Sequence, residues 1–480
     1  LPLGRRGPAA PAVSEARERV RAALKNSDLP FPRTAITINL APADVRKQGP
    51  MFDLAIAMSV LGASDMIDDV ERMRRTLFLG ELALDGAIRP IQGVLLAALM
   101  AKAQSYEGII VAEGNATEAA LVKGLNVYPA KTLLDVVAHF KARRQVGLVP
   151  QPTTIFTESD YCGEDMEHIR GQEQVKRAFE IAAAGNHNLL LYGPPGSGKT
   201  MLARALPSLL PPLSFEDMLE ITAIHSVAGA LHETGELVRA RPFRTPHHTA
   251  SGIALVGGGA WAKPGEISLA HRGVLFLDEF PEFSRQVLEN LRQPLEDGVV
   301  TVSRAAGTYE YPARFMLVAS MNPCPCGYLN DPKRECTCHP QQVVKYQQKI
   351  SGPLLDRIDI VTEVPRVDIE KLSSLTPGES SASIRARVLT ARERQHARFR
   401  GTNVATNAEL RSSLLRQHCA LSSDCLALMK SAVERLNMSA RAYTRVLKVA
   451  RTIADLAGDV ELATVHIAEA IQYRPKSLKQ

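Results

Sequence analysis

Eight consecutive residues near the middle of the chain have the spacing of a phosphate-binding loop. They match the pattern G-x-x-x-x-G-K-T and directly follow the apolar run Asn188–Tyr192. In order, they are Gly193, Pro194, Pro195, Gly196, Ser197, Gly198, Lys199 and Thr200. Glycines let backbone N–H groups wrap around phosphates, and a helix that begins after them adds a favourable dipole. We therefore predict ATP binding, with Lys199 reaching the β- and γ-phosphates and Thr200 ligating Mg²⁺.

A second apolar run, Val274–Leu277, leads into two carboxylates, Asp278 and Glu279. Adjacent acids at a strand end are often only solvated, but the phosphate-binding pattern upstream favours a catalytic interpretation. We predict that Asp278 binds Mg²⁺ and that Glu279 is the base that orients and polarises the attacking water.

Three more polar side chains have the types that stabilise phosphoryl transfer. Asn322 closes a third strand-like segment, where an amide would hold the lytic water or the γ-phosphate, a role called sensor 1. Arg357 is a candidate arginine finger, supplied to the ATP of a neighbouring subunit. Arg441, at the start of a helical pattern, is either a phosphate sensor of the helical domain or a solvated helix arginine.

Four of the seven cysteines crowd into a short segment as two C-x-C pairs. They are Cys324, Cys326, Cys336 and Cys338, and His339 follows directly. Four soft ligands in two close pairs are suited to a tetrahedral structural Zn²⁺ site, in which His339 would replace one thiolate if needed. The alternative is four reduced loop thiols.

These side chains need a scaffold that brings strand ends together, and the apolar runs indicate one. Strand-length runs alternate with helical segments within 155–365, which predicts an α/β fold with a parallel sheet flanked by helices. They are Asn188–Tyr192, Val274–Leu277, Phe315–Ala319 and Ile360–Val364. From about residue 381 only amphipathic helical patterns remain, such as Ala440–Ala457. Residues 13–145 mix helical stretches with strand-like runs at Ala35–Leu40 and Ile109–Ala112.

Composition is that of a soluble globular protein: 480 residues, 45% hydrophobic and 22% charged, with a net charge of +6. No run of eighteen apolar residues or secretory signal is found, so we expect no membrane association and a cytoplasmic location. The scattered remaining cysteines fit a reducing compartment. Residues 381–480 hold 17 basic and 8 acidic side chains, which suits either a polyanionic partner or a solvated helical face.

Taken in order, these motifs resemble AAA+ ATPases of the magnesium-chelatase-like group, and specifically the ComM/YifB family. The most specific stretches are Arg241–Ser251, Pro264–His271, Ser303–Gly307 and Asn322–Gly327. The resemblance covers roughly residues 13–475. It implies an N-terminal domain at 1–146, a linker at 147–160, an AAA+ core at 161–375 and a helical lid at 376–480.

The resemblance also implies two insertions that face the pore of a ring, a homo-hexamer. One would hold Arg244, the pair His247-His248 and Trp261; the other is a β-hairpin with Arg304 at its tip. An arginine there is suited to phosphates whatever the base sequence. The sole tryptophan either stacks on a base or anchors the loop. We predict DNA contacts for Arg244, Trp261 and Arg304, whereas two adjacent histidines without a third ligand are weak support for a metal.

Residues 13–145 resemble the Lon-type protease fold of this family. Met51 and Leu95 stand where the family pattern would have the nucleophilic serine and the lysine, so we expect a non-proteolytic domain. The first dozen residues do not resemble the family, and we expect this domain to be N-terminally incomplete.

The resulting hypothesis is a ring-forming ATPase that acts on single-stranded or branched DNA as a helicase or branch-migration motor, in natural transformation or recombination. A chelatase-type motor and a protein-remodelling ATPase are the alternatives.

Overall fold

A computed structural model describes eleven stretches of the chain: 11–32, 34–40, 50–141, 148–149, 151, 161, 163–231, 236–259, 262–304, 307–367 and 378–474. Side chains are not described for 11–14, 304, 307 and 412. The chain forms two units, which we describe separately. The first takes its described residues from Leu1–Glu158, Ser214–Arg239 and Ser303–Tyr309, and the second from the remainder. None of the described helices combines the length and apolar composition needed to cross a bilayer.

The first unit is built on a three-stranded parallel sheet in the order β1-β4-β5. The strands of this unit are β1 (Thr76–Phe78), β2 (Glu81–Leu82), β3 (Ile88–Arg89), β4 (Gly108–Ala112) and β5 (Asn126–Ala130). Its helices are α1 (Pro11–Asn26), η1 (Pro50–Phe52), α2 (Asp53–Gly62), α3 (Val70–Arg74), α4 (Val94–Ala103), η2 (Glu113–Asn115), α5 (Ala116–Ala119), α6 (Leu133–His139) and α9 (Phe215–Ala228). Strand β4 is buried along its whole length, as its continuous apolar sequence requires.

Helix α9 packs in this unit although it follows the phosphate-binding loop in sequence. The buried carboxylate of Glu118 accepts hydrogen bonds from the Leu95 N–H (2.9 Å) and from the Ser226 hydroxyl. The Ser226 oxygen in turn accepts from the Gly93 N–H at 2.9 Å. These bonds satisfy the buried carboxylate and join α9 to α4 and α5.

The second unit contains a five-stranded parallel sheet in the order β14-β6-β13-β10-β7. The strands are β6 (Leu189–Tyr192), β7 (Phe243–Arg244), β8 (Gly257–Gly258), β9 (Lys263–Pro264), β10 (Val274–Leu277), β11 (Val299–Arg304), β12 (Gly307–Pro312), β13 (Met316–Met321) and β14 (Ile360–Glu363). The core helices are η3 (Met166–His168), α7 (Glu173–Gly185), α8 (Lys199–Leu209), α10 (Gly252–Val256), α11 (Glu266–Leu269), η4 (Phe280–Glu282), α12 (Arg285–Glu289), α13 (Arg292–Asp297), α14 (Pro340–Gln347) and α15 (Gly352–Leu355). Strands β11 and β12 pair with each other, and their residues within Ser303–Tyr309 are counted with the first unit. Strand β8 pairs with β9.

Alternate side chains of the sheet enter two different cores, because successive residues of a strand point to opposite faces. Leu189, Phe276 and Val318 pack with α7, α8 and the C-terminal helices. Leu190, Leu275 and Leu317 pack on the other face, against α10 to α15. Both faces are covered, so the central strands β6, β10 and β13 are largely apolar.

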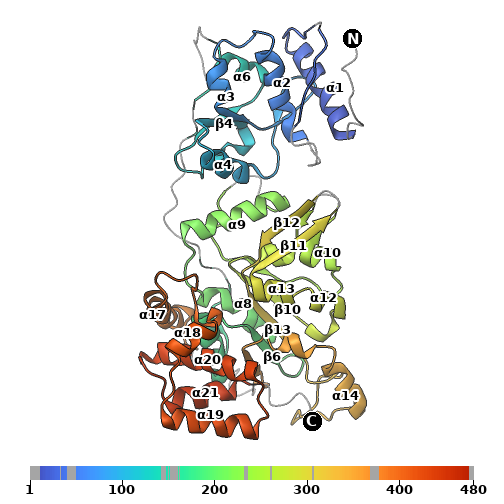
Figure 1. Ribbon diagram of the computed structural model, residues 1–480. Helices are drawn as coiled ribbons and strands as arrows, with labels where there is room; N and C mark the ends of the chain where they lie inside the picture. The colour runs from blue at the N-terminus through green and yellow to red at the C-terminus, as the bar shows by residue number, and fades with distance from the viewer. Residues whose placement is uncertain are drawn as a thin grey trace. The chain divides into compact units, whose positions relative to one another are not determined.

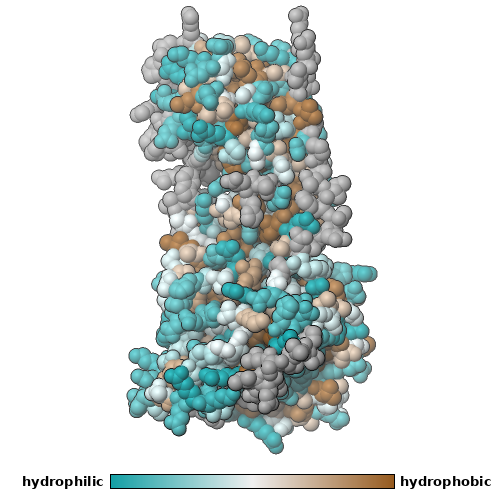
Figure 2. Space-filling model, turned by 180° about the vertical axis from the view of Figure 1, so that it is seen from behind, coloured by the Kyte–Doolittle hydropathy of each residue, from teal (hydrophilic) through white to brown (hydrophobic). Residues whose placement is uncertain are grey.

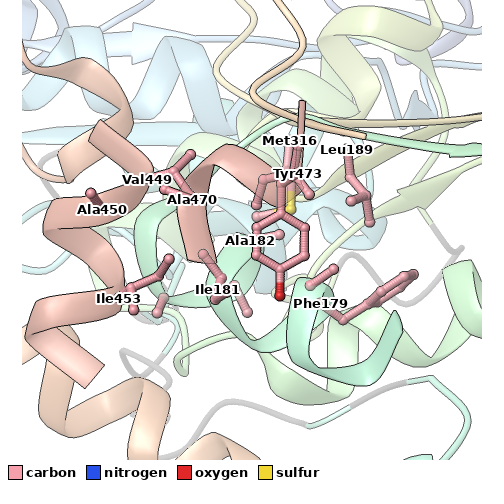
Figure 3. Close-up of a cluster of buried hydrophobic side chains, with 14 of the residues drawn as sticks. Phe179, Ile181, Ala182, Leu189, Met316, Val449, Ala450, Ile453, Ala470 and Tyr473 are labelled. Carbon is pink, nitrogen blue, oxygen red and sulfur yellow. The ribbon is translucent and has the colours of Figure 1, made fainter. Parts of the chain in front are cut away.

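The C-terminal helices pack onto the sheet's helices as a lid (Figure 1). They are α17 (Ser381–Arg398), η5 (Asn407–Glu409), α18 (Ser412–His418), α19 (Ser423–Arg435), α20 (Ala440–Ala457) and α21 (Thr464–Gln472). Figure 3 shows Val449 and Ile453 of α20 facing Ile181 and Ala182 of α7 in one apolar cluster. The lower part of the face drawn in Figure 2 is mostly hydrophilic, with apolar residues scattered between polar ones.

The structure confirms the predicted α/β class and its parallel sheet. The four apolar runs form β6, β10, β13 and β14, and the helical pattern Ala440–Ala457 forms α20. The strand predicted at Ala35–Leu40 is wrong: these residues form no strand and most are exposed. A β-branched run is only a local preference, and a strand also needs a neighbour for its backbone hydrogen bonds.

Candidate functional site

The phosphate loop connects β6 to α8 at the carboxyl edge of the parallel sheet. Gly196 and Gly198 have left-handed backbones (φ 75° and 89°), and a Cβ at either position would meet nothing within 4 Å. At position 193 glycine is required by a close contact instead, because a Cβ on Gly193 would lie 2.2 Å from the carbonyl oxygen of Val364. Gln172, which the sequence analysis missed, donates from its amide to the carbonyl of Ser197 at 2.9 Å and so braces the loop.

Lys199 turns back over the loop that precedes it. Its Nζ donates to the carbonyl oxygens of Gly193 (2.8 Å) and Pro194 (2.9 Å) and to Asn322 Oδ1 (3.2 Å). Burial lowers the pKa of Lys199, and the charge of Asp278 partly offsets this. A buried ammonium surrounded by neutral oxygens gains from an added anion, which is what a phosphate supplies.

Asp278 is held by neighbours on both sides at the end of β10. Its Oδ2 accepts from the Thr200 hydroxyl at 2.9 Å. Its Oδ1 accepts from the Ser320 hydroxyl and from the Glu279 N–H, the latter at 3.0 Å. The structure therefore brings together the two residues predicted to hold Mg²⁺. Ser320 lies within the buried strand β13, and no sequence signal separated it from its apolar neighbours.

Glu279 follows Asp278 with a left-handed backbone (φ 52°), which turns its side chain out of the strand. The carboxylate is 56% exposed, and its Oε2 lies 3.1 Å from Nδ1 of His248. The sequence suggests His248 only as a metal ligand, because it lies 31 positions before Glu279 and no spacing pattern links the two residues.

Arg357 lies at the opposite edge of the sheet from the phosphate loop of its own chain. Its backbone carbonyl accepts from the Asn188 side chain at 2.9 Å, and Asn188 directly precedes β6. The phosphate loop begins after the other end of β6, a strand of four residues. At about 3.3 Å per residue, the two ends lie about 13 Å apart. The guanidinium donates to the carbonyl of Pro353 (2.7 Å) and pairs with Glu296.

Arg441 lies at this same edge, where its Nη1 is 3.4 Å from Asp356 Oδ2. The neighbouring Arg445 binds the same carboxylate at 3.0 Å and the carbonyl of Leu355 at 2.9 Å. The structure therefore groups Arg357 with Arg441 and does not bring either to the phosphate loop of its own chain. Their roles in hydrolysis remain predictions.

Of the three residues predicted to contact DNA, Arg244 is the one whose side chain the structure describes. Arg244, in β7, is paired through both ends of its guanidinium with Glu266, at 2.6 and 2.7 Å. Arg304 ends β11 of the expected hairpin, but its side chain lies outside the described residues, as does the whole of Trp261.

The four clustered cysteines do come together, as the spacing suggested. Their Sγ atoms all lie within 4.8 Å of one another, and His339 is not in the group. The closest pairs are Cys324 with Cys326 (3.4 Å), Cys326 with Cys336 (3.6 Å) and Cys324 with Cys336 (3.7 Å). Burial raises the pKa of Cys326, but backbone N–H donors of the same loop outweigh it and lower the pKa to about 5.

Two observations indicate that the phosphate loop is suited to a nucleotide and the four cysteines to a metal ion. The hydroxyl oxygen of Ser197 is buried without a hydrogen-bond partner within the phosphate loop, where a bound phosphate would supply one. The thiol spacing fits tetrahedral Zn²⁺, for which Zn–S bonds of about 2.3 Å give S–S edges of about 3.8 Å.

A parallel sheet with a phosphate loop after one strand, and two adjacent carboxylates after another, defines a P-loop ATPase of the AAA+ class. Residues 165–372 match the family described as magnesium chelatase, subunit ChlI. Residues 378–474 match its C-terminal part, and residues 6–115 match subunit ChlI of Mg-chelatase.

Comparison with individual proteins identifies the family within this class more closely. The chain is 45% identical to competence protein ComM of Haemophilus influenzae over 472 residues, covering 96% of this chain and 90% of the relative. It is also 45% identical to YifB of Escherichia coli, covering 96% and 89%. The magnesium-chelatase 38 kDa subunit of Cereibacter sphaeroides is 26% identical over 47% of this chain and 70% of that subunit. The chain belongs to the ComM/YifB family of magnesium-chelatase-like AAA+ ATPases.

Proposed function

We propose that this chain is one subunit of a ring-forming ATPase that moves on single-stranded or branched DNA. Its activity would be that of a helicase or branch-migration motor that promotes DNA integration in natural transformation or recombination. The observation that carries the proposal is the match, over nearly the whole chain, to a relative named for competence. The similarity to a chelatase subunit is lower and covers about half of the chain, so a chelatase-type motor is the alternative.

Hydrolysis is assigned to side chains of this chain with separate tasks. MgATP, when bound, supplies the phosphoanhydride bond and the metal charge that stabilises its cleavage. Lys199 would hold the β- and γ-phosphates, and Thr200 and Asp278 would hold the metal. Glu279 takes the proton of the attacking water, and Asn322, which already contacts Lys199, orients that water.

The positions of two arginines support assembly into a ring. Arg357 and Arg441 lie at the sheet edge opposite the phosphate loop of their own chain, where contacts with Asn188 and Asp356 hold them. We propose that both act on the nucleotide of the adjacent subunit, in a homo-hexamer. Hydrolysis would then require assembly.

The N-terminal unit is assigned a structural or DNA-binding role and not proteolysis. Leu95 is fully buried with its N–H bonded to Glu118, and Met51 offers only a thioether. We propose that this unit has a Lon-like fold without a catalytic serine and lysine.

We propose further that the four cysteines hold structural Zn²⁺. Cys324 is two residues from Asn322, and Gly327 of the same loop contacts Pro195 of the phosphate loop. A metal that fixes this loop would also fix the position of Asn322.

The decisive experiment measures ATP hydrolysis with and without single-stranded or forked DNA, in the wild type and in Arg304→Ala. DNA should stimulate the wild type, and Arg304→Ala should lose most of this stimulation. Lys199→Ala should be inactive under every condition. No stimulation by DNA, together with stimulation by an unfolded protein or by a tetrapyrrole and its metal, would overturn the proposal.

A further inference from the structure

Arg445, in α20 of the lid, binds the loop that carries Arg357. Its Nη1 donates to the carbonyl oxygens of Leu355 (2.9 Å) and Ile358 (2.6 Å), and its Nη2 lies 3.0 Å from Asp356 Oδ1. The three acceptors belong to residues on both sides of Arg357 in the sequence. One guanidinium from the lid therefore holds the chain immediately before and immediately after the candidate arginine finger.

The end of α15, a helix of four residues, is suited to such a partner. Carbonyl groups at the C-terminal end of a helix have no partner within it, and they favour a nearby cation. The Arg445 side chain is 15% exposed, and its planar fork of donors fixes its orientation once the acceptors are in place. Arg441, one turn earlier in α20, is by contrast 68% exposed and contacts Asp356 at 3.4 Å. Arg445 is thus committed to its own chain, whereas Arg441 stays accessible.

The same loop is fixed to β6 on its other side. The Arg357 carbonyl accepts from the Asn188 side chain at 2.9 Å, and the Asp359 N–H donates to the Asn188 carbonyl at 3.1 Å. Asn188 belongs to the core and Arg445 to the lid, so the backbone of Arg357 is held from two directions. Without Arg445, the lid would no longer fix the carbonyls beside Arg357, and the point from which the guanidinium extends would shift.

We propose that Arg445 is a positioning residue that sets where Arg357 is presented to the ATP of the adjacent subunit. This inference rests on the proposed function, because it takes Arg357 as an arginine finger that acts between subunits. It goes beyond that function by making the finger depend on the lid of the chain that supplies it. Arg445 itself touches neither nucleotide nor water in the reaction.

The test measures ATP hydrolysis and the Kd of a fluorescent ATP analogue for the whole chain carrying Arg445→Ala. The control is Arg435→Ala, which removes an exposed arginine of α19 in the same lid. Arg445→Ala should lower kcat about 100-fold, the loss expected when a catalytic group is displaced by about 1 Å. Its Kd should stay within about twofold, because the phosphate loop follows the other end of β6. Arg435→Ala should match the wild type in both measurements.

Mixing of subunits distinguishes a misplaced finger from damage to the chain's own nucleotide site. Lys199→Ala subunits keep both Arg357 and Arg445, so they should restore part of the activity of Arg445→Ala subunits, as of Arg357→Ala subunits. A second variant, Arg445→Lys, guards against a folding defect because it keeps the charge and the apolar stem but not the planar fork. It should show the same lowered kcat, the same unchanged Kd and the same recovery on mixing.

Three results would overturn the inference: a wild-type kcat in either Arg445 variant, a Kd that rises in step with the loss of kcat, or no recovery when Arg445→Ala is mixed with Lys199→Ala. Failure of the proposed function is distinguishable from these. In that case Arg357→Ala subunits themselves are not recovered by Lys199→Ala subunits, whereas failure of this inference alone leaves that recovery intact.

Discussion

Replacing Gly327 with alanine should weaken ATP binding through a contact between two loops. Gly327 follows the first cysteine pair and has a left-handed backbone (φ 86°). A Cβ there would lie 2.5 Å from Cδ and 2.6 Å from Cγ of Pro195, in the phosphate loop. The proline ring has little freedom to move, so either the phosphate loop or the loop after Asn322 must shift.

The free-energy cost of Gly327→Ala has two parts. A non-glycine residue in the left-handed region costs about 1–2 kcal/mol. An overpacked contact adds about 1–3 kcal/mol. Gly401 provides the matched control, because its φ is 81° and a Cβ there would meet nothing within 4 Å. Gly401→Ala therefore carries the backbone cost alone.

Fluorescent ATP-analogue titration separates the two parts. If the contact strain falls on the phosphate loop, Gly327→Ala should raise Kd by about 5- to 150-fold, which is the equivalent of 1–3 kcal/mol. Gly401→Ala should leave Kd within about twofold while lowering the free energy of unfolding by about 1–2 kcal/mol. Equal Kd values for the two variants would refute the reasoning.

Three further predictions follow from single contacts. Arg357→Ala subunits should be inactive alone but should regain part of their ATPase activity when mixed with Lys199→Ala subunits, which still supply an intact arginine. If the mixture is only as active as the two variants measured separately and summed, Arg357 does not act on a neighbouring subunit. Cys336→Ser should lose bound zinc, measured by metal analysis of the purified protein, and equal zinc in both proteins would exclude this thiol as a ligand. Hydrogen bonds from Arg387 lower the pKa of Glu379 to about 2, from an ordinary 4.5. The stability from this pair is therefore fully present above pH 4.5 and is lost as the pH falls toward 2. Acid unfolding of Glu379→Gln should depend less on pH over that interval than the wild type.

Much of the fold was predictable because its signals are local. The central strands β6, β10 and β13 are almost entirely apolar, since both faces of the parallel sheet are buried there. The phosphate loop is recognisable because its glycines, lysine and threonine are adjacent in sequence and perform one task together. Ala35–Leu40 shows the limit of this reasoning: its pattern favours a strand, but no described neighbour pairs with it.

The sequence by itself determined the nucleotide chemistry of this protein, its α/β class and the cluster of four cysteines. Only the tertiary structure decided which side chains lie next to the residues of the nucleotide site. The placement of His248 beside Glu279 and of Ser320 beside Asp278 depends on the order of strands in the sheet. The placement of Arg357 away from its own phosphate loop depends on which end of β6 it contacts. Strand order is set by the packing of segments far apart in the chain, and no spacing within one segment encodes it.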